Sequence, residues 1–148
     1  MKRSRILGSN LTLVAVGLMA GSAMAVDGWM SEAEVRREIV GKNLAGHYAS
    51  GLKWSETYRS DGRLDYREPS RHAVGDWSFT GDVFCTFYDA GMTGGCWHVK
   101  KTGRNCYEFY SASRSRRPET IEAEKKQQTW TARGWRTEEP SSCELPTV

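Results

Sequence analysis

Hydrophobic and polar residues alternate with a period of about two along most of the chain from residue 43 to residue 135. Successive side chains of a strand point to opposite faces, so this alternation predicts β-strands. Gly, Asp and Ser separate the alternating runs about every 8–12 residues, a spacing typical of sheets, sandwiches and small barrels. The expected strands are 43–50, 53–59, 63–68, 72–80, 83–88, 96–100, 105–110 and 129–135.

One stretch near the beginning of the chain has a helical pattern instead. Val35 and Ile39 lie four residues apart, and Ser31 with Glu34 fits a capping box. We therefore expect a short helix over about 32–40 that packs its apolar stripe on the sheet. A second segment, 119–128, suits a helix by propensity, and a solvated strand extension fits it equally well.

Together these elements predict an α+β fold, mainly an antiparallel β meander with one N-terminal helix. A sheet, a sandwich and a small barrel all fit the pattern, and a comparison with lipocalins is an analogy only. The chain has 148 residues, which suits one domain. We expect a single β-rich domain over residues 26–148, with its core at about 42–110 and a C-terminal extension over 111–148.

The first 25 residues have the organisation of a secretory signal peptide. Basic residues at positions 2, 3 and 5 precede an apolar run over 11–20, and Ala23-Met24-Ala25 supplies a cleavage pattern. The apolar run is shorter than the roughly 20 residues of a transmembrane helix. The sequence therefore predicts a periplasmic or secreted protein without a stable membrane anchor after cleavage.

Removal of this segment changes the charge of the protein. The whole chain has 21 Lys and Arg against 18 Asp and Glu, and three of the basic residues lie in the first 25 residues. The mature chain is therefore formally neutral, whereas nucleic-acid-binding domains usually carry a positive excess. We expect no nucleic-acid partner. The local cluster of Arg114, Arg116 and Arg117 is most simply a solvated loop.

The four cysteines, Cys85, Cys96, Cys106 and Cys143, contain no C-x-x-C pair. Zinc ribbons and thioredoxin-like redox sites depend on that short spacing. In an exported protein, an even number of cysteines instead indicates disulfides. Antiparallel pairing of strands 83–88 and 96–100 places Cys85 opposite Cys96, within the reach of a disulfide.

A register argument then assigns the second disulfide. If Lys101 pairs with Arg104, Val99 faces Cys106, which places Cys106 on the face of Val99 and Trp97 and away from Cys96. The partner left for Cys106 is Cys143. We therefore predict the pairs Cys85–Cys96 and Cys106–Cys143.

The order of turns, aromatic residues and cysteines forms a longer pattern. It runs through Gly41-Lys42-Asn43, Trp54, Tyr58, Asp61-Gly62, Gly75-Asp76-Trp77, Gly81-Asp82, Cys85, Tyr88, Cys96 and Val99. This pattern resembles a family of small exported proteobacterial proteins of unknown function. The resemblance covers about residues 42–110 and implies a fold but no activity. The segment after Tyr110 is longer and more charged than the family pattern.

The sequence contains no recognisable catalytic or metal-binding motif. His47, His72 and His98 lack short paired spacing with another ligand residue, and no G-x-S-x-G elbow is present. The acidic residues Glu56, Asp65 and Asp76 alternate with apolar residues, which suggests the solvent face of a sheet. We expect no catalytic residue, no bound metal and no cofactor, and hence a protein that is not an enzyme.

Aromatic residues are the remaining candidates for function, with six Trp and six Tyr, all after residue 25. Trp54, Tyr58 and Tyr66 are a candidate binding face across the Asp61-Gly62 hairpin, since aromatic faces stack on sugars and anchor protein partners. Pairing of Ser60 with Arg63 leaves Tyr66 only diagonal to Tyr58. Packing in the core is the alternative for all three.

These observations favour an exported binding or interaction module of the cell envelope, whose ligand is an unknown protein or glycan. An inhibitor of a hydrolase is one version of such a module. The alternative is a small carrier of hydrophobic ligands with a cavity inside a barrel. A small enzyme is the least supported reading.

Overall fold

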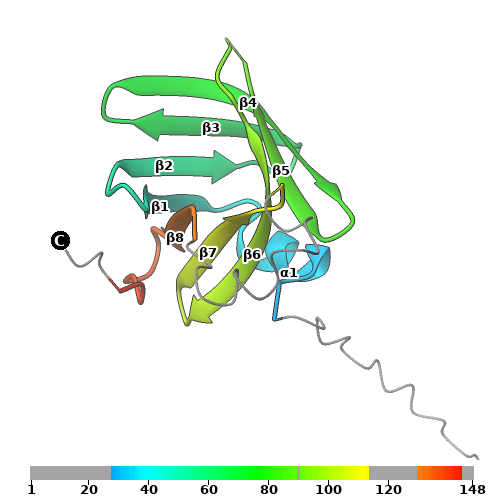
Figure 1. Ribbon diagram of the computed structural model, residues 1–148, viewed down its shortest axis with the longest axis vertical. Coiled ribbons are helices and arrows are strands. Elements are labelled where there is room, and N and C mark those ends of the chain that lie inside the picture. The colour runs from blue at the N-terminus through cyan, green and yellow to red at the C-terminus, as the bar shows by residue number, and fades with distance from the viewer. Residues whose placement is uncertain (1–27, 90, 114–129, 145–148) are drawn as a thin grey trace, which may run out of the picture.

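The strands of the computed structural model, which describes residues 28–89, 91–113 and 130–144, form one closed antiparallel barrel (Figure 1). Each strand pairs with its neighbours along the chain, and the last strand pairs with the first. The elements are α1 (Glu32–Glu38), β1 (Asn43–Tyr48), β2 (Lys53–Tyr58), β3 (Arg63–Glu68), β4 (Arg71–Thr80), β5 (Val83–Tyr88), β6 (Gly95–Gly103), β7 (Cys106–Ser111) and β8 (Ala132–Arg136).

The antiparallel meander predicted from the alternation is confirmed, and its closure makes it a barrel. All eight expected strands are present, with bounds that differ by a few residues at most. Closure comes from the pairing of β1 with β8, which runs from Leu44 opposite Arg136 to Tyr48 opposite Ala132. The expected signal peptide, the segment 119–128 and the arginine cluster lie outside the described residues.

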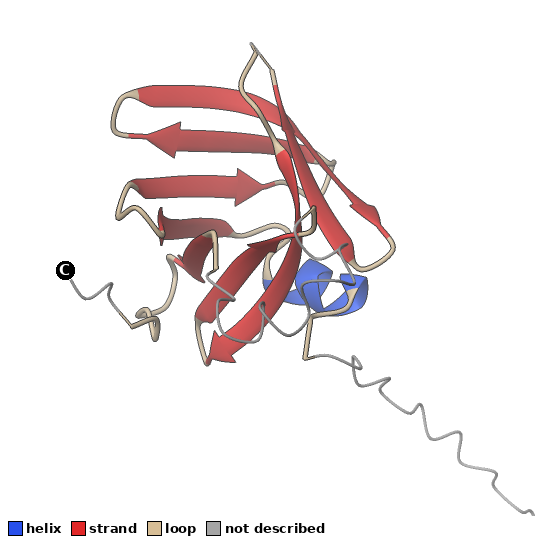
Figure 2. Cartoon of the chain, viewed as in Figure 1, coloured by secondary structure: helices blue, strands red, loops and turns tan. Residues whose placement is uncertain are grey.

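Helix α1 lies across one end of the barrel (Figure 2). Its start is the predicted capping box, because Ser31 N–H donates to Glu34 Oε2 at 2.8 Å and Glu34 N–H donates to Ser31 Oγ at 3.4 Å. Val35 and Ile39 are fully buried in the core of the barrel, as the spacing predicted. The helix ends at Glu38, slightly earlier than expected. This end of the barrel is therefore closed.

Both predicted disulfides are present. Cys85 and Cys96 are directly opposed on β5 and β6, with Cα atoms 4.0 Å apart, and Cys106 is bonded to Cys143. Disulfides are typical of oxidising compartments, so the two pairs indicate an extracytoplasmic location. In the part of the chain that the structure describes, no helix has the length and apolar character needed to cross a membrane.

The register behind the second pair was wrong, although the pair itself is right. Val99 lies opposite Phe109 and Gly103 lies opposite Cys106, because an irregularity between Lys101 and Gly103 shifts the register. Cys106 therefore lies on the outer face of β7, since its neighbour Tyr107 is buried inside the barrel. Cys106 and Cys96 both lie on the outer face of the barrel. They cannot pair because Cys96 lies near the start of β6, whereas Cys106 lies opposite Gly103 at its end.

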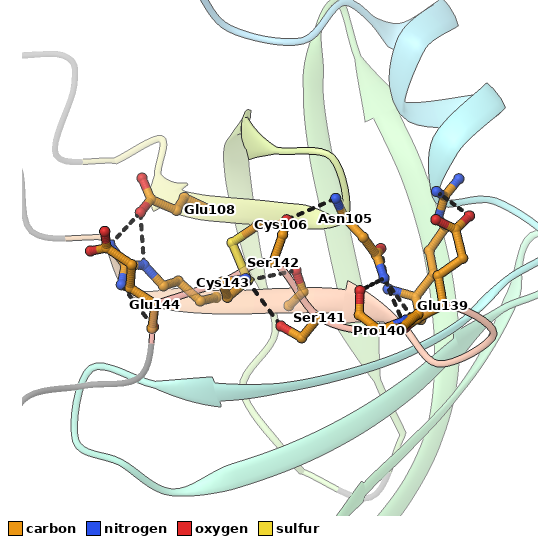
Figure 3. Close-up of a disulfide and its surroundings, with 12 residues drawn as sticks. Asn105, Cys106, Glu108, Glu139, Pro140, Ser141, Ser142, Cys143 and Glu144 are labelled. Atoms are coloured by element: carbon orange, nitrogen blue, oxygen red, sulfur yellow. Dashed lines mark hydrogen bonds and ion pairs between the residues drawn. A yellow bond between two sulfur atoms is a disulfide. The ribbon is translucent and has the colours of Figure 1, made fainter.

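The Cys106–Cys143 disulfide fastens the segment after β8 to the outside of the barrel (Figure 3). Asn105, which is fully buried, reinforces this attachment. Its Nδ2 donates to the carbonyl oxygens of Arg136, Glu139 and Pro140 at 2.9–3.2 Å, and its Oδ1 accepts from the Arg136 N–H. The buried amide and the disulfide thus help to hold this segment, together with backbone hydrogen bonds from Thr137 to Asn43 and from Ser142 to Asn105.

Candidate functional site

A narrow crevice lies inside the barrel. Six aromatic side chains from five strands line it: Tyr48, Trp54, Tyr58, Tyr88, Trp97 and Phe109. Glu56, Thr86 and Ala132 complete its wall. Its free volume is about 30 Å³, which is room for about two water molecules. Pockets for drug-sized molecules have about 300–1,000 Å³, so the crevice admits only a small group.

Glu56 is the acidic residue of this crevice, and its side chain is almost completely buried, with 5% of the residue exposed. Tyr58 Oη donates to its Oε2 at 2.6 Å, and Tyr88 Oη donates to its Oε1 at 2.9 Å. Burial raises the pKa of Glu56 to about 7, although the two tyrosine hydrogen bonds favour the ionised form. Among the described residues, no Lys, Arg or His forms an ion pair with Glu56. The carboxyl is therefore buried without a countercharge.

A second hydrogen-bonded chain lies beside Glu56 in the barrel. Tyr66 Oη donates to Glu68 Oε1 at 2.6 Å, so Tyr48 Oη donates to Tyr66 Oη, 2.7 Å away. Burial raises the pKa values of Tyr48 and Tyr66, which keeps both hydroxyls protonated as donors at neutral pH. The polar groups around the crevice are thus oriented before any ligand arrives.

Trp54, in the wall of the crevice, has an unsatisfied hydrogen-bond donor. Its Nε1 is buried and has no hydrogen-bond partner within the described part of the chain. The indole ring is fixed by an edge-on contact with Phe109, with ring centroids 6.1 Å apart. It also lies over Gly46 of β1 and Gly134 of β8, where any Cβ would approach its ring atoms. A buried indole N–H usually has an acceptor, so an acceptor on a bound molecule would satisfy this donor.

The ring of Trp54 leads to a stability prediction at these two glycines. We expect Gly46→Ala to lower the free energy of unfolding by about 2 kcal/mol, because the new Cβ would overlap the Arg133 carbonyl oxygen and lie 2.5 Å from Trp54 Cε2. Gly134→Ala is the matched control, since its Cβ meets a ring atom at 2.7 Å but no backbone atom closer than 3.5 Å. Urea denaturation of both variants measures the difference. Equal losses would show that the overlap with the Arg133 carbonyl adds nothing to the contact with the indole, and would contradict this prediction.

The predicted binding face is not an outer surface. Trp54, Tyr58 and Tyr66 are 6%, 3% and 1% exposed and all point into the barrel. The register of the hairpin also differs by one residue from the predicted one, because Tyr58 lies opposite Leu64 and Tyr66 lies opposite Glu56. The structure thus brings the three residues to one face, but that face is the interior. Their role in binding stays a prediction.

The expectation that Glu56 faces solvent was wrong. Asp65 and Asp76 do lie on the outer face, where Asp65 contacts His72 at 3.0 Å and Asp76 contacts Arg63 at 2.9 Å. Glu56 instead has the same parity on β2 as Trp54 and Tyr58, and all three are buried. The spacing of two residues from Trp54 and from Tyr58 was the signal in the sequence that Glu56 faces the interior. We assigned Glu56 to solvent because carboxylates usually prefer water.

The histidines do not converge on one site. His47 is buried on the outer face between Trp130 and Trp135, where burial and the nearby Arg133 lower its pKa. His98, on β6, stacks on Trp29, and His72 is exposed beside Asp65. Within residues 28–89, 91–113 and 130–144, no group of three or more His, Cys, Asp or Glu residues is placed to hold a metal ion.

Comparisons with protein-family models, with curated proteins and with solved structures found no match to this chain. The resemblance to an exported proteobacterial family therefore stays a prediction, and the geometry of the barrel alone carries the functional argument.

Proposed function

We propose that this protein is a binding module of the cell envelope, periplasmic or secreted, which receives a small protruding group of a protein or glycan ligand in its inner crevice. The observation that carries this proposal is a buried carboxyl without a countercharge in the crevice, beside a wall residue, Trp54, whose buried indole N–H has no acceptor among the described residues. Unmet polar groups of this kind cost stability, and binding sites are where proteins commonly retain them.

The small carrier is the second candidate, and the closed barrel favours it. Eight-stranded barrels are of the size that holds one small ligand, as in lipocalins. The free volume of about 30 Å³, however, is too small for a whole hydrophobic ligand. Its walls also carry a carboxyl and several hydroxyls, which a purely apolar ligand would leave without partners. A protruding polar group therefore fits the crevice better than an enclosed apolar molecule does.

Capture of ligands from an envelope extract by the exported, oxidised protein tests this proposal. We expect Ala132→Val, which narrows the crevice, to reduce capture at least tenfold, because Ala132 lies in its wall opposite Tyr48 and Phe109. Phe87→Ser is the matched control, since Phe87 is 54% exposed on the outside of β5. Capture that survives Ala132→Val and is lost in Phe87→Ser would place the site on the outer surface and contradict the proposal.

A further inference from the structure

The crevice contains an acid without a countercharge, Glu56, and its wall residue Trp54 has a buried donor without an acceptor in the described part of the chain; both restrict the chemistry of the ligand. We propose that the crevice binds a primary amine with a hydroxyl or ether oxygen on the carbon next to the one that bears the nitrogen, as in ethanolamine. The ammonium group pairs with the Glu56 carboxylate, and the oxygen accepts the Trp54 Nε1–H. This inference rests on the proposed function, because it names the ligand chemistry of the same site.

The charge of the ligand follows from the surroundings of Glu56. The carboxylate offers about four acceptor positions, and the hydroxyls of Tyr58 and Tyr88 occupy two of them. The remaining positions match the N–H donors of a primary ammonium. Aromatic rings form most of the rest of the wall, and the faces of such rings attract cations most strongly where water is excluded. An anion would be repelled by the Glu56 carboxylate and by the negative faces of the aromatic rings.

The size of the crevice selects among cations. A free volume of about 30 Å³ accommodates an ammonium group and its adjoining atoms but not a sugar ring or an arginine side chain. A quaternary ammonium is bulkier and has no N–H to donate to Glu56. A primary amine at the tip of a larger molecule satisfies both conditions.

The oxygen of the ligand follows from Trp54. Its Nε1–H is buried without an acceptor, and Trp54 is two residues from Glu56 on the same face of β2. Side chains two residues apart on a strand are neighbours on that face. An acceptor oxygen next to the amine is therefore within reach of the indole when the amine contacts Glu56. A simple alkylamine would leave this donor unsatisfied.

Binding should strengthen as the pH rises through about 7, where Glu56 ionises. The titratable groups that face it are Tyr48 from β1, Tyr58 from β2, Tyr66 and Glu68 from β3 and Tyr88 from β5. Burial raises the pKa of each of these tyrosines, so they stay neutral in this range. Glu68 already accepts from Tyr66. We expect the affinity for an amine to rise about tenfold from pH 6 to pH 8.

Titration with ethanolamine, followed by the ¹⁵N–¹H signal of the Trp54 indole, tests the inference. Ethylamine, ethylene glycol and acetate are the comparison probes. In the wild type we expect ethanolamine to bind more tightly than ethylamine, and both more tightly than the other two. Glu56→Gln should weaken ethanolamine binding at least tenfold and remove its pH dependence. Trp54→Phe, followed by the Trp97 indole, should make ethanolamine and ethylamine bind equally.

The outcomes separate the inference from the proposed function. Binding of ethylene glycol or acetate in preference to both amines would overturn the amine assignment and leave a crevice that binds small groups. Equal binding of ethanolamine to wild type and Glu56→Gln would also overturn it. If none of the four probes shifts the indole signals and capture is insensitive to Ala132→Val, both the inference and the proposed function are wrong.

Discussion

Replacement of Cys106 and Cys143 by serine is expected to lower the free energy of unfolding by about 4 kcal/mol. The disulfide spans 37 residues, and closing a loop of that length removes much of the entropy of the unfolded chain. Whole domains are usually stable by only about 5–15 kcal/mol, so this one crosslink is a large part of the total. The buried Asn105 keeps its hydrogen bonds to the segment after β8, and the barrel should therefore still fold.

Urea denaturation of three oxidised proteins measures this effect. The matched control replaces Cys85 and Cys96, whose disulfide spans only 11 residues and whose loss should cost about 3 kcal/mol. We expect the larger decrease in the Cys106/Cys143 variant. A loss below about 1 kcal/mol there would show that the segment after β8 contributes little to the stability of the barrel.

Glu56→Gln is expected to stabilise the protein at alkaline pH by about 3 kcal/mol relative to wild type. The pKa of Glu56 is about 7 in the folded protein and about 4.5 in the unfolded chain, where the carboxyl is not buried. Each unit of this difference corresponds to about 1.4 kcal/mol of stability. Glutamine has the same shape and can hydrogen-bond to Tyr58 and Tyr88, but it never has to ionise inside the barrel. The cost of burying the charge is therefore removed.

The pH dependence has a definite sign. Below about pH 4.5 the carboxyl is protonated in both folded and unfolded protein, and Glu56 costs no ionisation energy. Between about pH 4.5 and pH 7 the unfolded chain releases the proton and the folded protein retains it, so stability falls as the pH rises. Above pH 7 both states are ionised and the loss is complete.

Denaturation of wild type and Glu56→Gln at pH 4.5 and pH 8.5 tests this prediction. We expect the two proteins to differ much less at pH 4.5 than at pH 8.5, where the variant is the more stable. Asp65→Asn is a useful control, because Asp65 lies on the outer face and its contacts with Arg67 and His72 lower its pKa. A wild type that is at least as stable as Glu56→Gln at pH 8.5 would contradict the burial of an uncompensated carboxyl.

The strands and disulfides could be predicted from the sequence because their signals are local. Alternation identified every strand, and the short loop after β5 brought Cys85 opposite Cys96. Closure of the barrel could not be predicted in the same way. It depends on the pairing of β1 with β8, which are about 90 residues apart and share no turn. The irregularity between Lys101 and Gly103 could not be predicted from the sequence either. It places Cys106 on the face of the sheet opposite to the predicted one.

The candidate site was harder to predict than the fold. Trp54, Tyr58 and Tyr66 were correctly grouped on one face, but whether that face is inside or outside depends on the closure of the sheet. Glu56 was assigned to solvent because isolated carboxylates avoid interiors. One of the two hydroxyls that donate to it, that of Tyr88, is 32 residues away on another strand. Such a partner is recognisable only once the barrel is closed.

The ionisation of the Glu56 carboxyl is the property that most directly distinguishes a buried acid from an exposed one. A pH titration of the Glu56 side-chain carbon by ¹³C NMR, assigned by the loss of the signal in Glu56→Gln, measures this ionisation directly in the oxidised protein. Burial without a countercharge predicts a midpoint at about pH 7. A midpoint near 4.5, the value of an exposed glutamic acid, would show that the carboxyl is in water and would contradict its burial in the crevice.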